Sequence, residues 1–157
     1  MDKIDHIIFK TLCIIVSALM FGMMVLIGAQ VFFRYIIGQS LTWSEELGRF
    51  MFIWMSFLGS CAAYYKGSHV ALDLFVRNVK GLPKKIITII IELFTLGFAS
   101  ALIVSGYNMV QVGALQRSPS LSVQMNIVFI VLPLSGALIF YFCSRKMYKA
   151  IRSPKED

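Results

Sequence analysis

Residues 11–33 read TLCIIVSALMFGMMVLIGAQVFF, a run of 23 residues without a charge. A helix needs about 20 apolar residues to cross the roughly 30 Å hydrocarbon core of a bilayer. A cleaved signal peptide would have an apolar core of only about 7–15 residues, followed by small residues. This run is longer, and Arg34 and Tyr35 follow it. It therefore predicts a retained transmembrane span.

The rest of the chain is also strongly apolar. Of its 157 residues 58% are hydrophobic and 15% are charged, and the mean hydropathy is +0.77. A soluble domain carries roughly 25% charged residues. Three more apolar runs predict spans at about 50–66, 86–110 and 123–143, of which the second is short. We predict an all-α integral membrane protein: a single domain, 1–157, with four transmembrane helices and a tail at 144–157.

The basic residues predict the orientation. Twelve of the 15 lie in the N-terminal tail, the connection between the second and third spans, and the C-terminal tail. The other three are Arg34, Arg49 and Arg117. Loops rich in lysine and arginine stay in the cytoplasm. We therefore predict a multi-pass membrane protein with both termini cytoplasmic.

The stretch between the first two spans contains its own helix start. Thr42 and Glu45 have the spacing of a capping box, in which each side chain bonds a backbone N–H at the helix end. We predict a short amphipathic helix over about 42–49 that lies in the outer interface and bends near Gly48 into the second span. Two interpretations of its charges stay open, a solvated helix start or a surface for a partner. The candidate residues are Arg34, Tyr35, Trp43, Glu45, Glu46 and Arg49.

Glu92 is the one charge within the third predicted span. An ionisable residue inside a span suggests a functional site by default, and a coupling site for a proton or an ion is one interpretation. The alternative is a carboxylate near the inner boundary, paired with a lysine or a polar group of a neighbouring helix. We favour this pairing.

Small residues at helical spacing let membrane helices approach closely, within the subunit or between subunits. They occur in the second and third spans as Ser56, Gly59, Ser60, Ala63, Gly97 and Ala101. His69 and Asp73 lie four residues apart in the cytoplasmic connection. They are either a pair on one helix face or part of an interfacial connection in which the histidine has a hydrogen-bond partner.

The residues that several kinds of catalysis and ligand binding require are absent from the sequence. The three cysteines are far apart in apolar runs, and the two histidines, His6 and His69, lie near the predicted cytoplasmic edge. There is no P-loop, no Ser/His/Asp set and no cluster of metal ligands in the sequence. The basic residues flank apolar runs instead of forming a face with stacking aromatics, so nucleic acid is not expected. We predict no enzyme, no cofactor and no metal.

The order of motifs resembles a known family. Arg34-Tyr35 is followed by Thr42-Trp-Ser-Glu-Glu46, then by Gly67-Ser-His-Val-Ala-Leu-Asp73. This is similar to the small, DctQ-like (Q) membrane subunit of tripartite ATP-independent periplasmic (TRAP) transporters. The strong match covers about residues 31–75. Outside these residues, the chain agrees with the family only in its length, its number of spans and its pattern of basic residues.

The resemblance implies a multi-pass protein of a bacterial inner membrane. It also implies a sodium-driven importer of an organic acid, such as sialic acid or a C4-dicarboxylate. A large (M) membrane subunit would carry substrate and sodium. The small subunit would brace it, surrounded by membrane lipid, and help to dock the periplasmic substrate-binding protein. His69 and Asp73 would lie on the cytoplasmic side and serve packing within the scaffold or against the large subunit. The alternative is a self-sufficient four-span carrier such as a drug/proton antiporter, which usually has an essential carboxylate in its first span. The first span here has none.

Overall fold

The computed structural model describes residues 3–38, 41–67 and 82–152. In these ranges the chain is helical apart from turns and one isolated β-bridge, between Arg117 and Gln124. The helices are α1 (Lys3–Phe32), the π-helical turn η1 (Phe33–Ile37), α2 (Thr42–Tyr65), α4 (Leu82–Gly113), α5 (Met125–Phe129) and α6 (Val131–Arg152). The prediction of an all-helical fold is confirmed.

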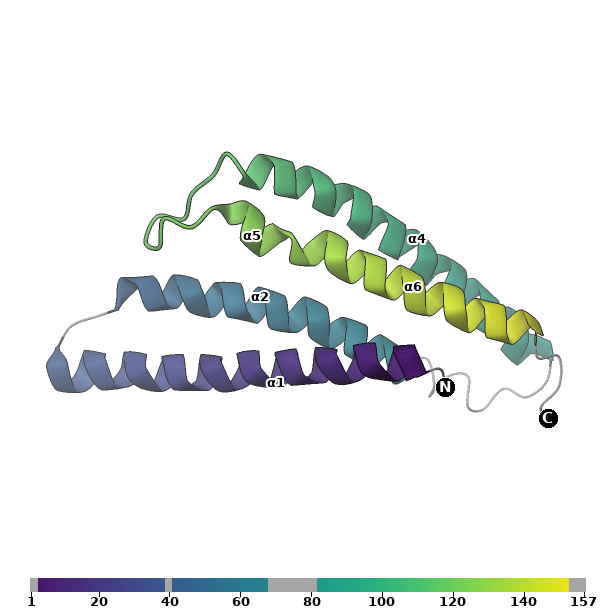
Figure 1. Ribbon diagram of the computed structural model, residues 1–157, viewed down its shortest axis with the longest axis horizontal. Coiled ribbons are helices and arrows are strands. Elements are labelled where there is room, and N and C mark those ends of the chain that lie inside the picture. Colours follow the sequence, from purple (N-terminus) through teal and green to yellow (C-terminus); the bar gives the residue numbers. More distant parts are fainter. Residues whose placement is uncertain (1–2, 39–40, 68–81, 153–157) are drawn as a thin grey trace.

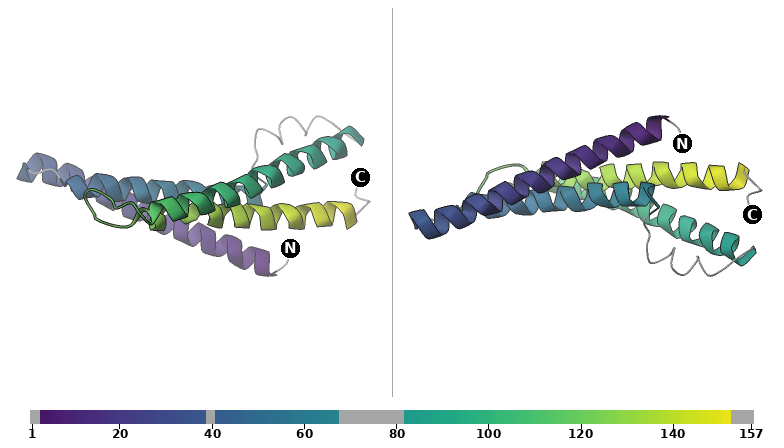
Figure 2. Two further views of the ribbon diagram at one scale, coloured as in Figure 1. Left: turned by 90° about the horizontal axis from the view of Figure 1, so that it is seen from above. Right: turned by 90° about the horizontal axis from the view of Figure 1, so that it is seen from below.

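The helices form two hairpins (Figure 1). In one, α1 lies along α2; in the other, α4 lies along α6, and α2 packs against α6 to join them. The start of α1, the end of α2, the start of α4 and the end of α6 lie at one end of the molecule, the terminal end. The opposite end, the loop end, contains η1, the start of α2 and residues 114–124. Figure 2 shows that α1 and α4 diverge toward the terminal end, where α6 lies between them.

Three helical stretches of the described chain are long and apolar enough to cross a bilayer: Lys3–Ile37, Ile89–Gly113 and Met125–Tyr148. Only 11% of the apolar window of the first is buried within the protein. Side chains such as Phe21, Met24 and Phe94 are exposed along these helices. Lipid or another apolar surface must therefore cover them.

α2 is not among these three stretches, because charged residues precede its apolar part and tyrosines end it. The helix is continuous from Thr42 to Tyr65, so the short helix predicted over about 42–49 is the first part of α2 and not a separate element. A single glycine in a helix interior costs only about 1 kcal/mol relative to alanine. Most helical stability in proteins comes from tertiary packing, and α2 packs along both α1 and α6.

The fourth predicted span is divided between α5 and α6, with Ile130 between them. Pro133 explains the interruption, because proline cannot donate a backbone hydrogen bond and its ring clashes with the preceding turn. The buried core lies mainly where α2, α4 and α6 meet. It consists of Leu12, Leu58, Cys61, Tyr64, Ala99, Val131, Ile139, Phe142 and Cys143.

Candidate functional site

The buried acidic side chains of the described chain lie toward the two ends of the bundle. At the loop end, Ser44 is completely buried. Its hydroxyl accepts a hydrogen bond from Gln30 Nε2 of α1 at 2.8 Å and donates one to the Leu41 carbonyl at 2.6 Å. Ser44 thus ties the start of α2 to the end of α1.

The predicted capping box was wrong. α2 begins with Leu41 as its N-cap residue, and no side chain caps it. Thr42 is the first helical residue, so its hydroxyl is one position too far along to satisfy the free N–H groups of the first turn. Ser44, two residues later, makes the local contact with the Leu41 carbonyl instead.

Glu46 holds a loop. Its Oε2 atom accepts hydrogen bonds from the backbone N–H groups of Ser120, at 3.0 Å, and Leu121, at 3.2 Å. A hydrogen bond with the Ser118 side chain, together with these backbone bonds and nearby Arg49, lowers the pKa of the Glu46 carboxyl. Bonds from N–H donors to a carboxylate are charge-assisted and stronger than neutral ones. Glu46 therefore attaches the connection between α4 and α5 to α2.

The loop that Glu46 holds has its own internal order. The Ser118 N–H donates to the Val123 carbonyl at 2.9 Å, and the Ser122 N–H donates to the Ser118 carbonyl at 3.0 Å. Arg117 Nη1 donates to the Ser122 carbonyl at 3.3 Å. Ser122 has a left-handed backbone, φ 54°, which closes this turn. The loop is a small folded unit.

The predicted docking residues fall into two groups. Arg34, Tyr35, Trp43, Glu45 and Arg49 are exposed at the loop end, with Tyr35 79% exposed. Glu46 is only 9% exposed. Adjacent positions on a helix point about 100° apart, so one glutamate of the pair faces outward and the other faces the loop.

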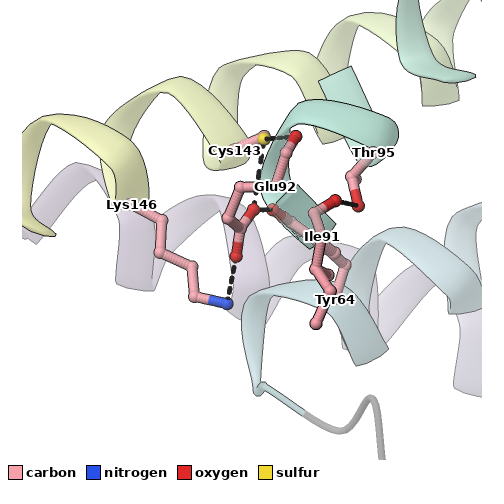
Figure 3. Close-up of polar contacts among 6 residues, drawn as sticks. All are labelled: Tyr64, Ile91, Glu92, Thr95, Cys143 and Lys146. Carbon is pink, nitrogen blue, oxygen red and sulfur yellow. Dashed lines mark hydrogen bonds and ion pairs between the residues drawn. The ribbon is translucent and has the colours of Figure 1, made fainter. Parts of the chain in front are cut away.

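At the terminal end, Glu92 of α4 is 3% exposed and lies among polar groups of two other helices (Figure 3). The Tyr64 hydroxyl of α2 donates a hydrogen bond to Glu92 Oε2. Lys146 Nζ of α6 lies 2.5 Å from Oε1, and Cys143 Sγ lies 3.2 Å from Oε2. The carboxylate thus connects α4 to both α2 and α6, which is the kind of pairing that the sequence favoured.

A second carboxylate makes the matching contact for α1. Asp5 is 5% exposed. Its Oδ1 atom accepts a hydrogen bond from the Tyr141 hydroxyl at 3.0 Å, and its Oδ2 atom lies 3.3 Å from Arg145 Nη2. The consecutive residues Arg145 and Lys146 of α6 therefore pair with acids of α1 and α4. These pairs were not predicted from the sequence. The signal was the basic end of the last helix, since acidic residues of other helices near the same membrane face are its natural partners.

The predicted small residues do not form the contact between α4 and α6. Ser56, Ser60, Ala63, Gly97 and Ala101 are exposed, and a Cβ atom at Gly59 or Gly97 would have no neighbour within 4 Å. Gly97 and Ala101 line a shallow groove with Leu93, Phe94 and Phe98. A neighbouring groove runs between α2 and α4, lined by Ser60, Tyr64, Phe94, Thr95, Phe98 and Ile139.

The close contact of α4 and α6 uses other glycines. A Cβ atom at Gly106 would lie 2.7 Å from Pro133 N, and one at Gly136 would lie 3.0 Å from the Ala99 carbonyl oxygen. Ala99, Gly106 and Gly113 repeat every seven residues along α4, a spacing that could have revealed them. His69 and Asp73 lie outside the described residues, and the described residues contain no cluster of metal-ligating side chains.

Long apolar helices with exposed apolar flanks, tied together by polar contacts at both ends, define the class: a multi-pass helical membrane protein. Residues 23–153 match the family of tripartite ATP-independent periplasmic transporters, DctQ component. The chain belongs to this family, whose members are small permease subunits of TRAP transporters. It is therefore a transporter component of the inner membrane and not an enzyme.

Three relatives illustrate the range of the family. The sialic acid TRAP transporter small permease protein SiaQ of Vibrio cholerae is 24% identical over 88% of this chain and 80% of its own length. The C4-dicarboxylate TRAP transporter small permease protein DctQ of Pseudomonas aeruginosa is 24% identical over 74% of this chain and 58% of its own length. The isethionate TRAP transporter permease protein DctMQ of Oleidesulfovibrio alaskensis is 27% identical over 76% of this chain, which is 20% of that protein.

Proposed function

We propose that this chain is the four-span small subunit of a sodium-driven, binding-protein-dependent TRAP transporter that imports an organic acid. In this proposal it braces the large transport subunit and contributes part of the surface on which the periplasmic binding protein docks. The additional span is the part of α2 from about residue 50 onward, both termini are cytoplasmic, and the loop end faces the periplasm.

The bracing role rests on one observation about the polar side chains. Asp5, Ser44, Glu46 and Glu92 are buried, and each bonds another segment of the same chain. A carrier needs polar groups along a pathway near the middle of the membrane, whereas these groups lie at the two ends of the bundle. Such contacts suit a frame whose helices keep a constant arrangement while a partner moves.

The relatives support a large-subunit partner. DctMQ is about five times as long as the segment that resembles this chain, and its name joins the M and Q components. A chain that contains both components suggests that separate M and Q chains also lie side by side. The exposed small residues of α2 and α4 are a suitable contact, because small residues allow close helix approach in membranes.

Co-purification tests the assignment. The tagged chain, extracted from its own cells in mild detergent, is expected to bring with it a much larger membrane protein. Reconstituted alone it is expected to transport nothing. Together with the large subunit and binding protein it should give sodium-dependent uptake of whichever of sialic acid or succinate the binding protein binds. Sodium-dependent uptake by the pure chain would instead favour a self-sufficient carrier.

Cysteine labelling tests the orientation. Gln116 is exposed in the loop at the loop end, and Ser153 belongs to the C-terminal tail. An impermeant maleimide added to intact spheroplasts is expected to label Gln116→Cys and to leave Ser153→Cys unlabelled until the cells are opened. The parent protein, with its three native cysteines, gives the background. The reverse pattern would overturn the proposed orientation.

A further inference from the structure

The connection between α4 and α5 is unusual because a helix of the other hairpin anchors it. Surface loops generally satisfy their backbone groups with water or with their own residues. Here two successive N–H groups, of Ser120 and Leu121, point to one carboxylate oxygen of Glu46 on α2. Successive N–H groups of this kind form an anion-binding concavity. The loop is therefore preordered and attached at a defined place.

The anchor changes the charge that the loop end presents. The described charged residues of this end are Arg34, Glu45, Glu46, Arg49 and Arg117. Glu46 is nearly buried and bonded to the loop amides, while the three arginines and Glu45 are exposed. The exposed charge is thus predominantly positive, and a complementary partner surface would be acidic.

Arg117 is fixed within the loop. Its backbone pairs with Gln124 in the isolated bridge, and its guanidinium donates to the Ser122 carbonyl at 3.3 Å. Two residues before it, Leu115 is 90% exposed. A preordered charge costs less entropy on binding than a charge on a free loop. A loop held by Glu46 can therefore act as a ready binding surface.

We infer that Glu46 is a positioning residue that holds residues 116–124 against α2, so that Arg117 presents its positive charge at a defined place of the loop end to an acidic face of the binding protein. The inference rests on the proposed function and deepens it. Glu46 acts through the loop, and Arg117 comes from the other hairpin than Arg34 and Arg49.

Binding to the intact transporter tests this inference. The small and large subunits are placed together in lipid nanodiscs, and the probe is the substrate-loaded binding protein of the same transporter, at low and high salt. Glu46→Gln and Arg117→Glu are each expected to weaken binding about fivefold or more at low salt, mainly through the association rate. Ser120→Ala is the matched control, because the backbone N–H that Glu46 binds remains. It should bind as the parent does.

Hydrogen exchange on the same samples reports the loop itself. In Glu46→Gln the amides of residues 116–124 should exchange faster, whereas in Arg117→Glu they should stay protected while binding still weakens. A released loop with unchanged binding would overturn the inference. Unchanged binding in Arg117→Glu would overturn it too. This variant leaves Glu46 in place, so it tests the inference even if Glu46→Gln fails to fold. If the parent complex binds no binding protein, the proposed function fails, and the inference with it.

Discussion

Glu92 has one carboxylate group that serves three helices. Its partners come from α2, through Tyr64, and from α6, through Cys143 and Lys146 (Figure 3). Burying a charge is unfavourable unless it is paired and hydrogen-bonded. The lysine side chain is 52% exposed, so solvent weakens the ion pair, and the hydrogen bonds carry much of the stabilisation.

Substitution of the pair should therefore affect stability more than transport. Glu92→Gln is expected to lower the free energy of unfolding by about 1–3 kcal/mol, because the tyrosine and lysine lose a charged acceptor. Lys146→Gln should cost less, since the hydrogen bonds remain. The double variant should lose less than the sum of the two, because the residues contact each other. Thermal unfolding in detergent measures this; altered sodium dependence in a normally stable Glu92→Gln would argue for ion coupling instead.

The anchor at Glu46 predicts a pH dependence. In the folded protein the pKa of Glu46 lies below its ordinary value of 4.5, so the docked loop favours the ionised form. The stabilisation is fully present above 4.5 and is lost as the pH falls through the lowered pKa. Exchange of the Ser120 and Leu121 amides, corrected for intrinsic rates, should be slow from pH 7 to 5 and faster in more acidic solution. Glu46→Gln should exchange fast throughout, and a parent protein with equal protection at all pH values would contradict this.

Among the elements, α4 and α6 depend on a close approach that glycine permits. A methyl group at Gly106 would collide with the Pro133 nitrogen at 2.7 Å, and backbone cannot move aside as a flexible side chain can. Pro133 itself explains the interruption at Ile130, and it lies in the first turn of α6, beside this glycine. The kink and the glycine thus form one contact between the two helices.

Gly106→Ala is expected to destabilise the protein by about 1–3 kcal/mol, the usual cost of overpacking. Gly97→Ala is the matched control, because it lies on the same helix with no atom within 4 Å of the added carbon. That change should be neutral or slightly stabilising, since alanine is the better helix former. Midpoints of thermal unfolding compare the two variants, and equal midpoints would refute the close contact.

For the whole molecule, the exposed apolar surface leaves two possible neighbours, lipid and protein. α1 buries little of its apolar length within the subunit, which suits lipid. The grooves beside Ser60, Phe94 and Gly97 have small residues at their edges, which suits a helix of the large subunit.

A pair of glycine substitutions tests which surface contacts the large subunit and which contacts lipid. Gly97 in the groove of α4 and Gly28 on α1 both lack neighbours within 4 Å of an added Cβ. Leucine at either position should leave the isolated chain stable. Gly97→Leu is expected to reduce co-purification of the large subunit several-fold, because an overpacked interface loses about 1–3 kcal/mol, while Gly28→Leu should not. Equal recovery in both variants would place the large subunit on another face.

Much of the fold could be predicted because it depends on local properties. Uninterrupted apolar runs such as residues 11–33 require a low-dielectric surrounding and a helix that satisfies its own backbone hydrogen bonds, and the motifs from Arg34 to Asp73 indicate the family. The partners of individual side chains could not be predicted in this way. The spacing of Thr42 and Glu45 fitted a capping box, yet the helix begins one residue earlier than the pattern required.

The sequence by itself determined the helical class, three of the membrane-crossing stretches and the family, because each depends on composition and order along the chain. Only the tertiary structure decided which glutamate of the pair faces the loop, which acids meet Arg145 and Lys146, and which small residues lie between helices. These contacts join residues that are up to 140 positions apart. Their partners depend on how each helix is rotated about its axis and shifted along it. That arrangement follows from packing all the helices together, which no single segment encodes.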